Sequence, residues 1–192
     1  NSLNFTDFAP ALQGNEQFAN IVFFLAFLGF GIKAGFVPFH NWLPDAHPAA
    51  PSHVSAIMSG VMIKTGLYGI LRVLFLIGTP SKCIAYTVFV VALVTALYGI
   101  LYALAQRDLK KLLAYSSIEN IGIIGLGLGL GMIGLAYGNQ LVAMLGFAGG
   151  ILHILNHSIF KELMFFGAGS VYNKTHTRDM EVLGGLIKKM PN

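Results

Sequence analysis

Five long apolar stretches are the feature of this sequence that most restricts its fold. Each approaches or exceeds the ~20 residues that an α-helix needs to cross the hydrocarbon core of a bilayer. Because no water reaches the backbone there, such segments must be helical, and the short alternating segments of an outer-membrane barrel are not seen. The sequence therefore predicts an all-α polytopic membrane protein. Its transmembrane helices are expected over residues 20–36, 54–77, 84–105, 112–137 and 140–172.

The composition agrees with a membrane protein. Charged residues make up 10% of the 192 residues and hydrophobic residues 55%, whereas soluble domains carry about 25% charged residues. The first apolar run begins only near Ile21 without a basic stretch before it, so we expect no cleavable signal segment. The single Cys83 excludes an internal disulfide. Because the chain begins at Asn1 rather than at a methionine, we expect one transmembrane domain, residues 1–192, from a longer polytopic subunit.

Most basic residues gather on one side of the predicted helices. If the five helices alternate in direction, the loops after the first, third and fifth helices share a side. That side carries Arg107, Lys110, Lys111, Lys174, Arg178, Lys188 and Lys189. The opposite side has Lys82 and little else. The positive-inside rule therefore places the loop with Lys110 and Lys111 and the C-terminal end in the cytoplasm, and the N-terminus outside. Since topology explains these charges, we predict no nucleic-acid partner.

Three groups of ionisable residues lie inside the apolar stretches. Lys33 lies near the end of the first stretch, and Lys64 lies near the middle of the second. A charge at the bilayer centre is unfavourable by about 2.5–3.5 kcal/mol even on insertion scales, so such residues usually face a protein interior or a wet cavity. Lys33 alone could instead extend its ammonium group to the membrane surface. Lys64 is too deep for that, because about 15 Å of helix separates it from either surface.

The third group consists of His153, His157 and Lys161 in the fifth stretch. Their spacing of four residues places them on one face of a helix, about 6 Å apart from level to level. Histidine changes charge near neutral pH, so a ladder of such groups could pass protons along a hydrated interior. The alternative for each histidine is a hydrogen-bonded residue of the helix core. The residues alone leave both interpretations open.

Metal and haem sites fit the sequence poorly. His153 and His157 in "HILNH" have the spacing of a zinc-binding helix, but no glutamate follows the first histidine as it does in metalloproteases. A haem would need a matching histidine at similar depth on a second helix. The other histidines lie in or near loops: His40, His47, His53 and His176. The sequence has neither a cysteine cluster for an iron–sulfur centre nor a dinucleotide loop. We therefore predict no metal and no cofactor in this chain.

The first apolar stretch must be interrupted shortly after Lys33. Pro38 follows, and further prolines stand at positions 44, 48 and 51; a proline lacks the backbone donor that a continuing helix needs. Ion-transporting membrane proteins place interrupted helices beside buried charges, because freed carbonyls and helix ends can line a wet cavity. We expect a broken helix near Lys33–Pro38, followed by a loop with His40, Asp45 and His47. These three residues serve either the structure of the loop or proton uptake.

Three blocks of the sequence carry a resemblance to known proteins: "KAGFVPFHNWLPDAHPAAPSHVSAIMSGVMIKTGLYGILR", "QRDLKKLLAYSSIENIGII" and "LHILNHSIFKELMFFGAGSV". They resemble the antiporter-like proton-channel subunits of respiratory NADH:quinone oxidoreductase, multisubunit Na⁺/H⁺ antiporters and membrane-bound nickel-iron hydrogenases. Within this superfamily, "AYSSIENIG" and "MSGVMIKTGLYG" are most similar to the large membrane subunit of formate hydrogenlyase and hydrogenase-4 type complexes.

The resemblance implies a larger fold with two inverted repeats of five helices, each containing one broken helix. It implies that Lys33 is the lysine of the first broken helix and that Lys64 is the central lysine of the next helix. The polar ladder that leads onward would then be His153, His157 and Lys161. The family's glutamate partner of the broken-helix lysine would lie before residue 1, and the second broken helix would lie after residue 192.

Glu119, in "SSIEN", departs from many relatives of the respiratory type, which carry a neutral amide there. Two interpretations remain open. Glu119 is an added relay group or counter-ion, or it is a residue near the cytoplasmic surface.

Two functions agree with these features. The first is a non-catalytic, proton-translocating subunit of a multisubunit oxidoreductase in the inner (cytoplasmic) membrane of a prokaryote. Its relay would contain Lys33, Lys64, His153, His157, Lys161 and Glu119. Redox chemistry would take place in partners, namely other membrane subunits and a peripheral arm of the nickel-iron hydrogenase or NADH dehydrogenase type. The alternative is a subunit of a multisubunit cation/proton antiporter that has no redox partner and also moves Na⁺.

Overall fold

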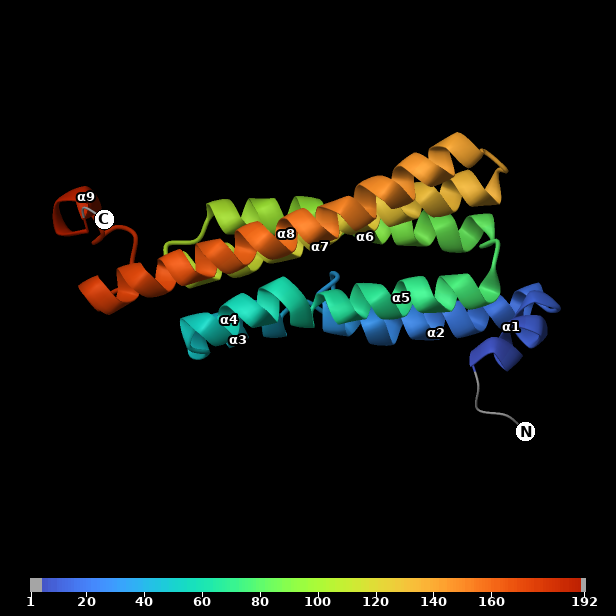
Figure 1. The fold of residues 1–192 in the computed structure, drawn as a ribbon, viewed down its shortest axis with the longest axis horizontal. Helices are drawn as coiled ribbons and strands as arrows, with labels where there is room; N and C mark the ends of the chain where they lie inside the picture. The colour runs from blue at the N-terminus through green and yellow to red at the C-terminus, as the bar shows by residue number, and fades with distance from the viewer. Residues whose placement is uncertain (1–4, 191–192) are drawn as a thin grey trace.

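The computed structural model describes residues 5–190, apart from the side chains of residues 5, 6 and 189. Its long helices run roughly parallel and form an elongated bundle (Figure 1). Five helical spans are long and apolar enough to cross a membrane: α2 (Glu16–Ala34), the segment Ser52–Ile77, α6 (Lys82–Leu104), α7 (Leu109–Ala136) and α8 (Gln140–Thr175). The prediction of an all-α protein with five transmembrane helices is therefore confirmed. The chain termini, which the sequence assigns to opposite sides of a membrane, lie outside the described residues.

The other helical elements are short. α1 (Phe5–Gln13), α3 (Trp42–Ala49) and α9 (Leu186–Lys189) lie outside the five spans. The span Ser52–Ile77 is not a uniform helix. It consists of α4 (Ser52–Ile57), the π-helix η1 (Met58–Met62) and α5 (Lys64–Ile77).

Side-chain caps fix where four of the long helices begin. Asn15, Ser81, Asp108 and Asn139 precede α2, α6, α7 and α8 and accept hydrogen bonds from backbone N–H groups of the first turn. Asp108 accepts two such bonds, at 2.8 and 3.0 Å. Each cap satisfies a donor that the start of a helix leaves unpaired, which stabilises the helix by about 1 kcal/mol. The caps thereby set the positions of the ionisable groups along the bundle.

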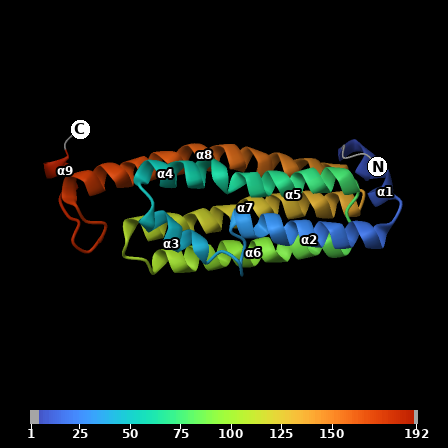
Figure 2. The same cartoon turned by 90° about the horizontal axis from the view of Figure 1, so that it is seen from below.

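Glycines let α7 approach both of its neighbours closely. A methyl group on Gly122 would lie 2.3 Å from the backbone nitrogen of Ala96 in α6. One on Gly127 would lie 2.8 Å from the Cα of Gly150 in α8. Any side chain at these positions would push the helices apart, so small residues are required for this packing. α7 therefore lies between α6 and α8, as Figure 2 shows.

The first span is interrupted after Lys33, as the prolines predict. α2 ends at Ala34, and Gly35 caps it with a positive φ of 91°, a conformation that glycine adopts without strain. The chain then passes through the cis Val37–Pro38 peptide bond, and α3 begins at Trp42. The predicted broken helix near Lys33–Pro38 is confirmed.

Two side chains hold the interruption in place. The backbone N–H of Val37 donates to the hydroxyl of Thr95 in α6 at 3.1 Å. The indole N–H of Trp42, in α3, donates to the carbonyl of Ile32 at the end of α2 at 2.9 Å. The two halves of the broken helix are thus bonded to each other and to α6.

The π-helix η1 interrupts the second span immediately before Lys64. The backbone N–H of Ile63 bonds to the carbonyl five residues before it, at 3.2 Å. Such wide turns occur frequently at functional sites, where their carbonyls can bind side chains. Here the carbonyls of Ser59 and Gly60 accept hydrogen bonds from Lys64 and Ser158. This turn was not predicted from the sequence.

The basic residues gather at one end of the bundle. The α3–α4 turn, the α6–α7 loop and the segment after α8 lie together at that end, shown on the left in Figure 1. The α5–α6 and α7–α8 connections lie at the other end, where the Lys82 ammonium stands 4.3 Å from the ring centre of Tyr137. The loops that the sequence assigns to one side therefore do share an end.

Candidate functional site

Lys64 is the first residue of α5 and is only 8% exposed. Its ammonium group turns back onto η1 and donates to the carbonyl of Ser59. A buried ammonium needs such an acceptor because it has left water, and the π turn supplies one. Lys161 and Glu162 of α8 lie within electrostatic range of Lys64. The charge on Lys64 is therefore coupled to groups on α8.

A series of hydrogen bonds joins the turn at Lys64 to Lys161. The hydroxyls of Ser59 and Ser117 are 2.7 Å apart. Ser117 donates its hydroxyl hydrogen to the carbonyl of Leu113 at 2.9 Å, so Ser59 must be the donor to Ser117. The Lys161 ammonium donates to the same carbonyl at 3.3 Å. Both serines and Lys161 are fully buried. The two lysines are thus linked through η1 and α7 inside the bundle.

His157 is fully buried, and neither of its ring nitrogens has a hydrogen-bond partner among the described residues. Its ring centre lies 6.4 Å from that of His153, one turn earlier in α8. Lys64 and Lys161 are both within electrostatic range. Buried polar atoms are normally paired, so His157 keeps hydrogen-bonding capacity that no described residue uses.

His153 is bonded to α7. Its Nε2 lies 2.9 Å from the amide oxygen of Asn120, whose own amide group donates to the carbonyl of Ser116 at 2.7 Å. An amide oxygen only accepts, so Nε2 of His153 carries the hydrogen in this contact. His153, His157 and Lys161 therefore share the face of α8 that the four-residue spacing predicts, and this face is turned toward α7.

Glu119 is half-buried one position before Asn120. Its carboxylate accepts a hydrogen bond from the hydroxyl of Ser116 at 3.3 Å. His153 and Lys161 lie within its electrostatic range. The position of Glu119 therefore suits a counter-ion beside the ladder.

Lys33 is not joined to this network. Its side chain is exposed at the end of α2, and it forms no hydrogen bond or ion pair with the residues between 5 and 190. The structure therefore gives Lys33 no partner within the described chain, whereas it connects Lys64, His153, His157, Lys161 and Glu119.

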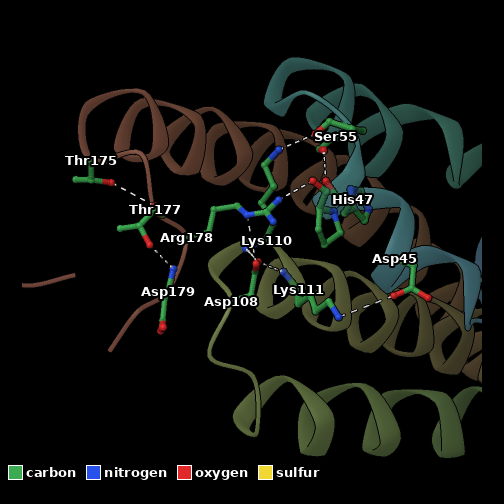
Figure 3. Close-up of polar contacts among 12 residues, drawn as sticks. Asp45, His47, Ser55, Asp108, Lys110, Lys111, Thr175, Thr177, Arg178 and Asp179 are labelled. Atoms are coloured by element: carbon green, nitrogen blue, oxygen red, sulfur yellow. Dashed lines mark hydrogen bonds and ion pairs between the residues drawn. The ribbon is translucent and has the colours of Figure 1, made fainter. Parts of the chain in front are cut away.

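His47 lies in α3 at the basic end and is fully buried. Its ring stacks on Phe165 of α8 at 4.6 Å, and neither ring nitrogen has a partner in the described chain. Its carbonyl accepts a hydrogen bond from Ser55 at 3.0 Å (Figure 3). His47 thus packs between α3 and α8 rather than in an open loop.

His40 and Asp45 have different surroundings. His40 is buried against Tyr98 of α6, with the ring centres 4.5 Å apart. Asp45 lies in α3 rather than in the predicted loop. It is exposed, and its carboxylate lies 3.9 Å from the ammonium of Lys111 (Figure 3). Of the three residues that the sequence places after the break, only Asp45 therefore faces outward.

Two cations bind the chain where α3 ends. Arg178 donates to the carbonyl of Pro48 at 2.6 Å, and Lys110 donates to that of Ala50 at 2.7 Å. Arg178 also pairs with Asp108 at 3.3 Å (Figure 3). The carbonyls at the end of a helix lack helical partners and attract positive charge, so these contacts stabilise the second half of the broken helix.

Several polar residues of the network were missed from the sequence: Ser59, Ser117, Asn120, Ser158 and Glu162. Serines and small amides are common in packed transmembrane helices. Which of them meet depends on how η1, α7 and α8 are rotated against one another. The one local signal was the carboxylate of Glu162, directly after Lys161 in an apolar segment.

No three His, Cys, Asp or Glu side chains gather as a metal site would within residues 5–190. The absence of a resident metal or cofactor stays a prediction. The chemistry that these groups themselves can support is the binding and transfer of protons, since lysine, histidine and glutamate all titrate.

The helical spans, the broken helix and the buried ladder together define an antiporter-like membrane protein. Residues 1–192 match the family described as NADH:quinone oxidoreductase/Mrp antiporter, transmembrane, and the chain belongs to this family. The resemblance stated from the sequence is therefore confirmed.

Curated relatives include subunits of several complexes. The chain is 49% identical over 193 residues to hydrogenase-4 component B of Escherichia coli (strain K12), covering 99% of this chain and 29% of the relative. It is 45% identical over 170 residues to formate hydrogenlyase subunit 3 of the same organism, covering 88% of this chain and 28% of the relative. NADH-quinone oxidoreductase subunit M of Rickettsia felis is 35% identical over 187 residues, and the match covers 96% of this chain and 36% of the relative. The chain thus spans about a third of the length of these relatives.

Two solved structures share the fold. One is the membrane-bound sulfane sulfur reductase, an archaeal respiratory membrane complex, with a TM-score of 0.80 and 30% identity over 93% of this chain and 35% of the other. The second is the Mrp complex from Dietzia sp. DQ12-45-1b, with a TM-score of 0.84 and 26% identity over 99% of this chain and 33% of the other.

Proposed function

We propose that this chain is part of a non-catalytic, proton-translocating subunit of a multisubunit oxidoreductase complex. Lys64, His157 and Lys161 carry the proton through the bundle. His153 extends this relay, and Glu119 is a counter-ion beside it. Lys33 is the lysine of the broken helix, and it works with groups outside the described residues.

The connection between the two buried lysines is the observation that carries this proposal. Ser59 and Ser117 place two exchangeable hydroxyls between the turn that holds Lys64 and the carbonyl that also holds Lys161. His157 lies within range of both lysines with two unpaired nitrogens, and it supplies the titratable step between them. A packed core with no transport role has no need for this set of groups.

Coupling to redox chemistry follows from electrostatics. Close titratable groups share their protons, so a change in charge beside one of them alters the proton affinity of the next. A charge shift in a neighbouring subunit would therefore move a proton from one lysine toward the other. The redox cofactors belong to other chains, and the relatives of hydrogenase, formate hydrogenlyase and NADH-quinone oxidoreductase type support such partners. These partners are other membrane subunits and a peripheral redox arm.

The orientation in the membrane is part of the proposal. The end that carries Arg107, Lys110, Lys111 and Arg178 faces the cytoplasm, and the end with Lys82 faces outside. The chain would then lie in the inner membrane of a prokaryote, with its N-terminus outside and its C-terminal end in the cytoplasm. His40, Asp45 and His47 lie at the cytoplasmic half of the broken helix, where protons are taken up.

A second candidate is a subunit of a cation/proton antiporter without a redox partner. The likeness to the Mrp complex structure favours it. The subunit-level identities of 49% and 45% to hydrogenase-4 component B and formate hydrogenlyase subunit 3 favour the redox-linked function. Purification of the full-length protein from native membranes separates the two. We expect hydrogenase-like or NADH dehydrogenase-like subunits to accompany it, and antiporter subunits alone would establish the second candidate.

Substitution of Lys64 tests proton transport itself. In the full-length subunit within its complex, Lys64→Ala should abolish proton pumping while the complex still assembles, because the buried ammonium is lost from the centre of the relay. Pumping is measured in reconstituted vesicles and normalised to assembled complex. Exposed Lys82 provides a lysine-to-alanine control that should pump normally. Normal pumping by assembled Lys64→Ala complexes would overturn the proposal.

A further inference from the structure

A second row of polar side chains runs along α8 beside the His153–His157–Lys161 ladder. Ser158 and Glu162 are four residues apart, so they lie on one face of the helix. The hydroxyl of Ser158 donates to the carbonyl of Gly60 in η1 at 2.7 Å. This row therefore faces the π turn, whereas the ladder faces α7.

The side chain of Glu162 fills the space that a side chain at position 60 would need. A Cβ atom on Gly60 would lie 2.0 Å from Oε1 of Glu162 and 2.5 Å from its Cγ. The carboxylate is thus laid against the backbone of η1. Glu162 is half-buried, and it forms no hydrogen bond or ion pair with any of residues 5–190. A carboxylate in this position has capacity to accept a hydrogen bond that nothing in the described chain uses.

Lys64 reaches toward the same place. It follows Gly60 by four residues and is the first residue of α5, directly after the π turn. Its ammonium already donates to the carbonyl of Ser59, which belongs to the peptide bond that Gly60 completes. Electrostatic interaction between Lys64 and Glu162 agrees with this proximity.

We propose that Glu162 is a proton acceptor for Lys64, so that the relay branches at this lysine. The Lys64 ammonium leaves the carbonyl of Ser59 and bonds to the carboxylate of Glu162. An N–H bond of the ammonium breaks and an O–H bond forms on the carboxylate, which leaves a neutral amine and a neutral carboxylic acid. This inference rests on the proposed proton transport. It adds a carboxylate outside the Lys64–Lys161 connection and gives the π turn and Gly60 a function.

The charged groups around the pair determine which way the proton moves. Lys161 lies next to Glu162 in α8 and acts on Lys64 as a second cation. His157 and His153, in the same helix as Lys161, lie within electrostatic range of Lys64. A proton that arrives on Lys161 or His157 therefore repels the ammonium of Lys64 and weakens the hold of Lys64 on its proton.

Two substitutions of Glu162 separate proton transfer from packing. Glu162→Gln keeps the shape and removes the titratable group, whereas Glu162→Asp shortens the side chain and keeps that group. If Glu162 accepts the proton, the Glu162→Gln variant should lose more than half of the pumping per redox turnover. The Glu162→Asp variant should then retain more pumping than the Glu162→Gln variant. If Glu162 serves only in packing, the Glu162→Gln variant should pump more than the Glu162→Asp variant, or both should pump normally. Glu181→Gln, an exposed carboxylate at the basic end, is the matched control.

Gly60→Ala supplies an independent test. Its methyl group would lie 2.0–2.6 Å from Oε1, Cγ and Cδ of Glu162, so this side chain must turn away from η1, and we expect the protein still to assemble because the nearest atoms belong to a flexible side chain rather than to backbone. Pumping should fall as in Glu162→Gln, and the double variant should fall no further, because both changes remove the same step. Full additivity of the two losses would contradict the branch. Normal pumping by Glu162→Gln together with lost pumping by Lys64→Ala would reject this inference alone, and normal pumping by Lys64→Ala would reject the proposed function itself.

Discussion

The hydroxyl groups of Ser59 and Ser117 meet across 2.7 Å at the contact between η1 and α7. Neither serine would attract notice alone. Their contact joins the carbonyl-rich π turn that holds Lys64 to the carbonyl of Leu113, which holds Lys161. Two lysines on helices far apart in the sequence are thereby placed in one polar path through an otherwise apolar bundle.

Loss of the Ser117 hydroxyl should interrupt this path. In Ser117→Ala the hydroxyl of Ser59 loses its acceptor, and we expect pumping per redox turnover to fall. The lost hydrogen bond should reduce stability by about 1 kcal/mol, which leaves the complex assembled. Ser170→Ala, which removes an exposed hydroxyl bonded to its own helix, is the control. Equal pumping by both variants, measured in reconstituted vesicles, would show that the serine pair is structural.

The native Cys83 can report the orientation of the chain. It is exposed next to Lys82, at the end of the bundle that we assign to the outside. A membrane-impermeant thiol reagent should therefore label Cys83 in intact cells, and Cys83→Ser identifies the signal in the full-length protein. A cysteine introduced as Lys111→Cys in the Cys83→Ser background should react only after the membrane is opened. The opposite pattern of labelling would reverse the topology.

Much of the architecture follows from local sequence signals. Apolar length predicts the five spans, and Pro38 predicts the break after Lys33, because both effects act within one segment of chain. The ladder on α8 follows from spacing alone, since residues four apart share a helix face whatever the helix packs against.

The remaining features depend on contacts between helices. The π turn at η1 is held by Lys64 and by Ser158 from α8, and the sequence around Ser59 contains no local sign of it. Likewise, the position of Glu162 over Gly60 depends on the rotation of α8 against η1. Such relations require the relative placement of two helices, which neither helix encodes by itself.

Arg178 should matter for stability more than an ordinary surface arginine. Arg178→Ala removes its bond to the carbonyl of Pro48 and its ion pair with Asp108, so we expect a loss of about 1–2 kcal/mol. Arg107→Ala is the matched control, because Arg107 and its partner Glu181 are mostly exposed and such pairs contribute about 0–1 kcal/mol. Thermal unfolding of the purified complex measures both. A greater loss for Arg107→Ala would contradict the capping role of Arg178.

Substitutions of His157 distinguish most clearly between a role in proton transport and a role in packing. Its two ring nitrogens have no partner in the described chain, so its replacement breaks no hydrogen bond there. If His157 carries protons between Lys64 and Lys161, His157→Ala should slow pumping more than His157→Gln, because glutamine can still order water although it does not titrate. If His157 only fills space against Phe160, its loss should appear as poor assembly or lower thermal stability, with pumping per assembled complex unchanged. Pumping stoichiometry in reconstituted vesicles, normalised to assembled complex, distinguishes these outcomes, and unchanged stoichiometry for both variants would remove His157 from the relay.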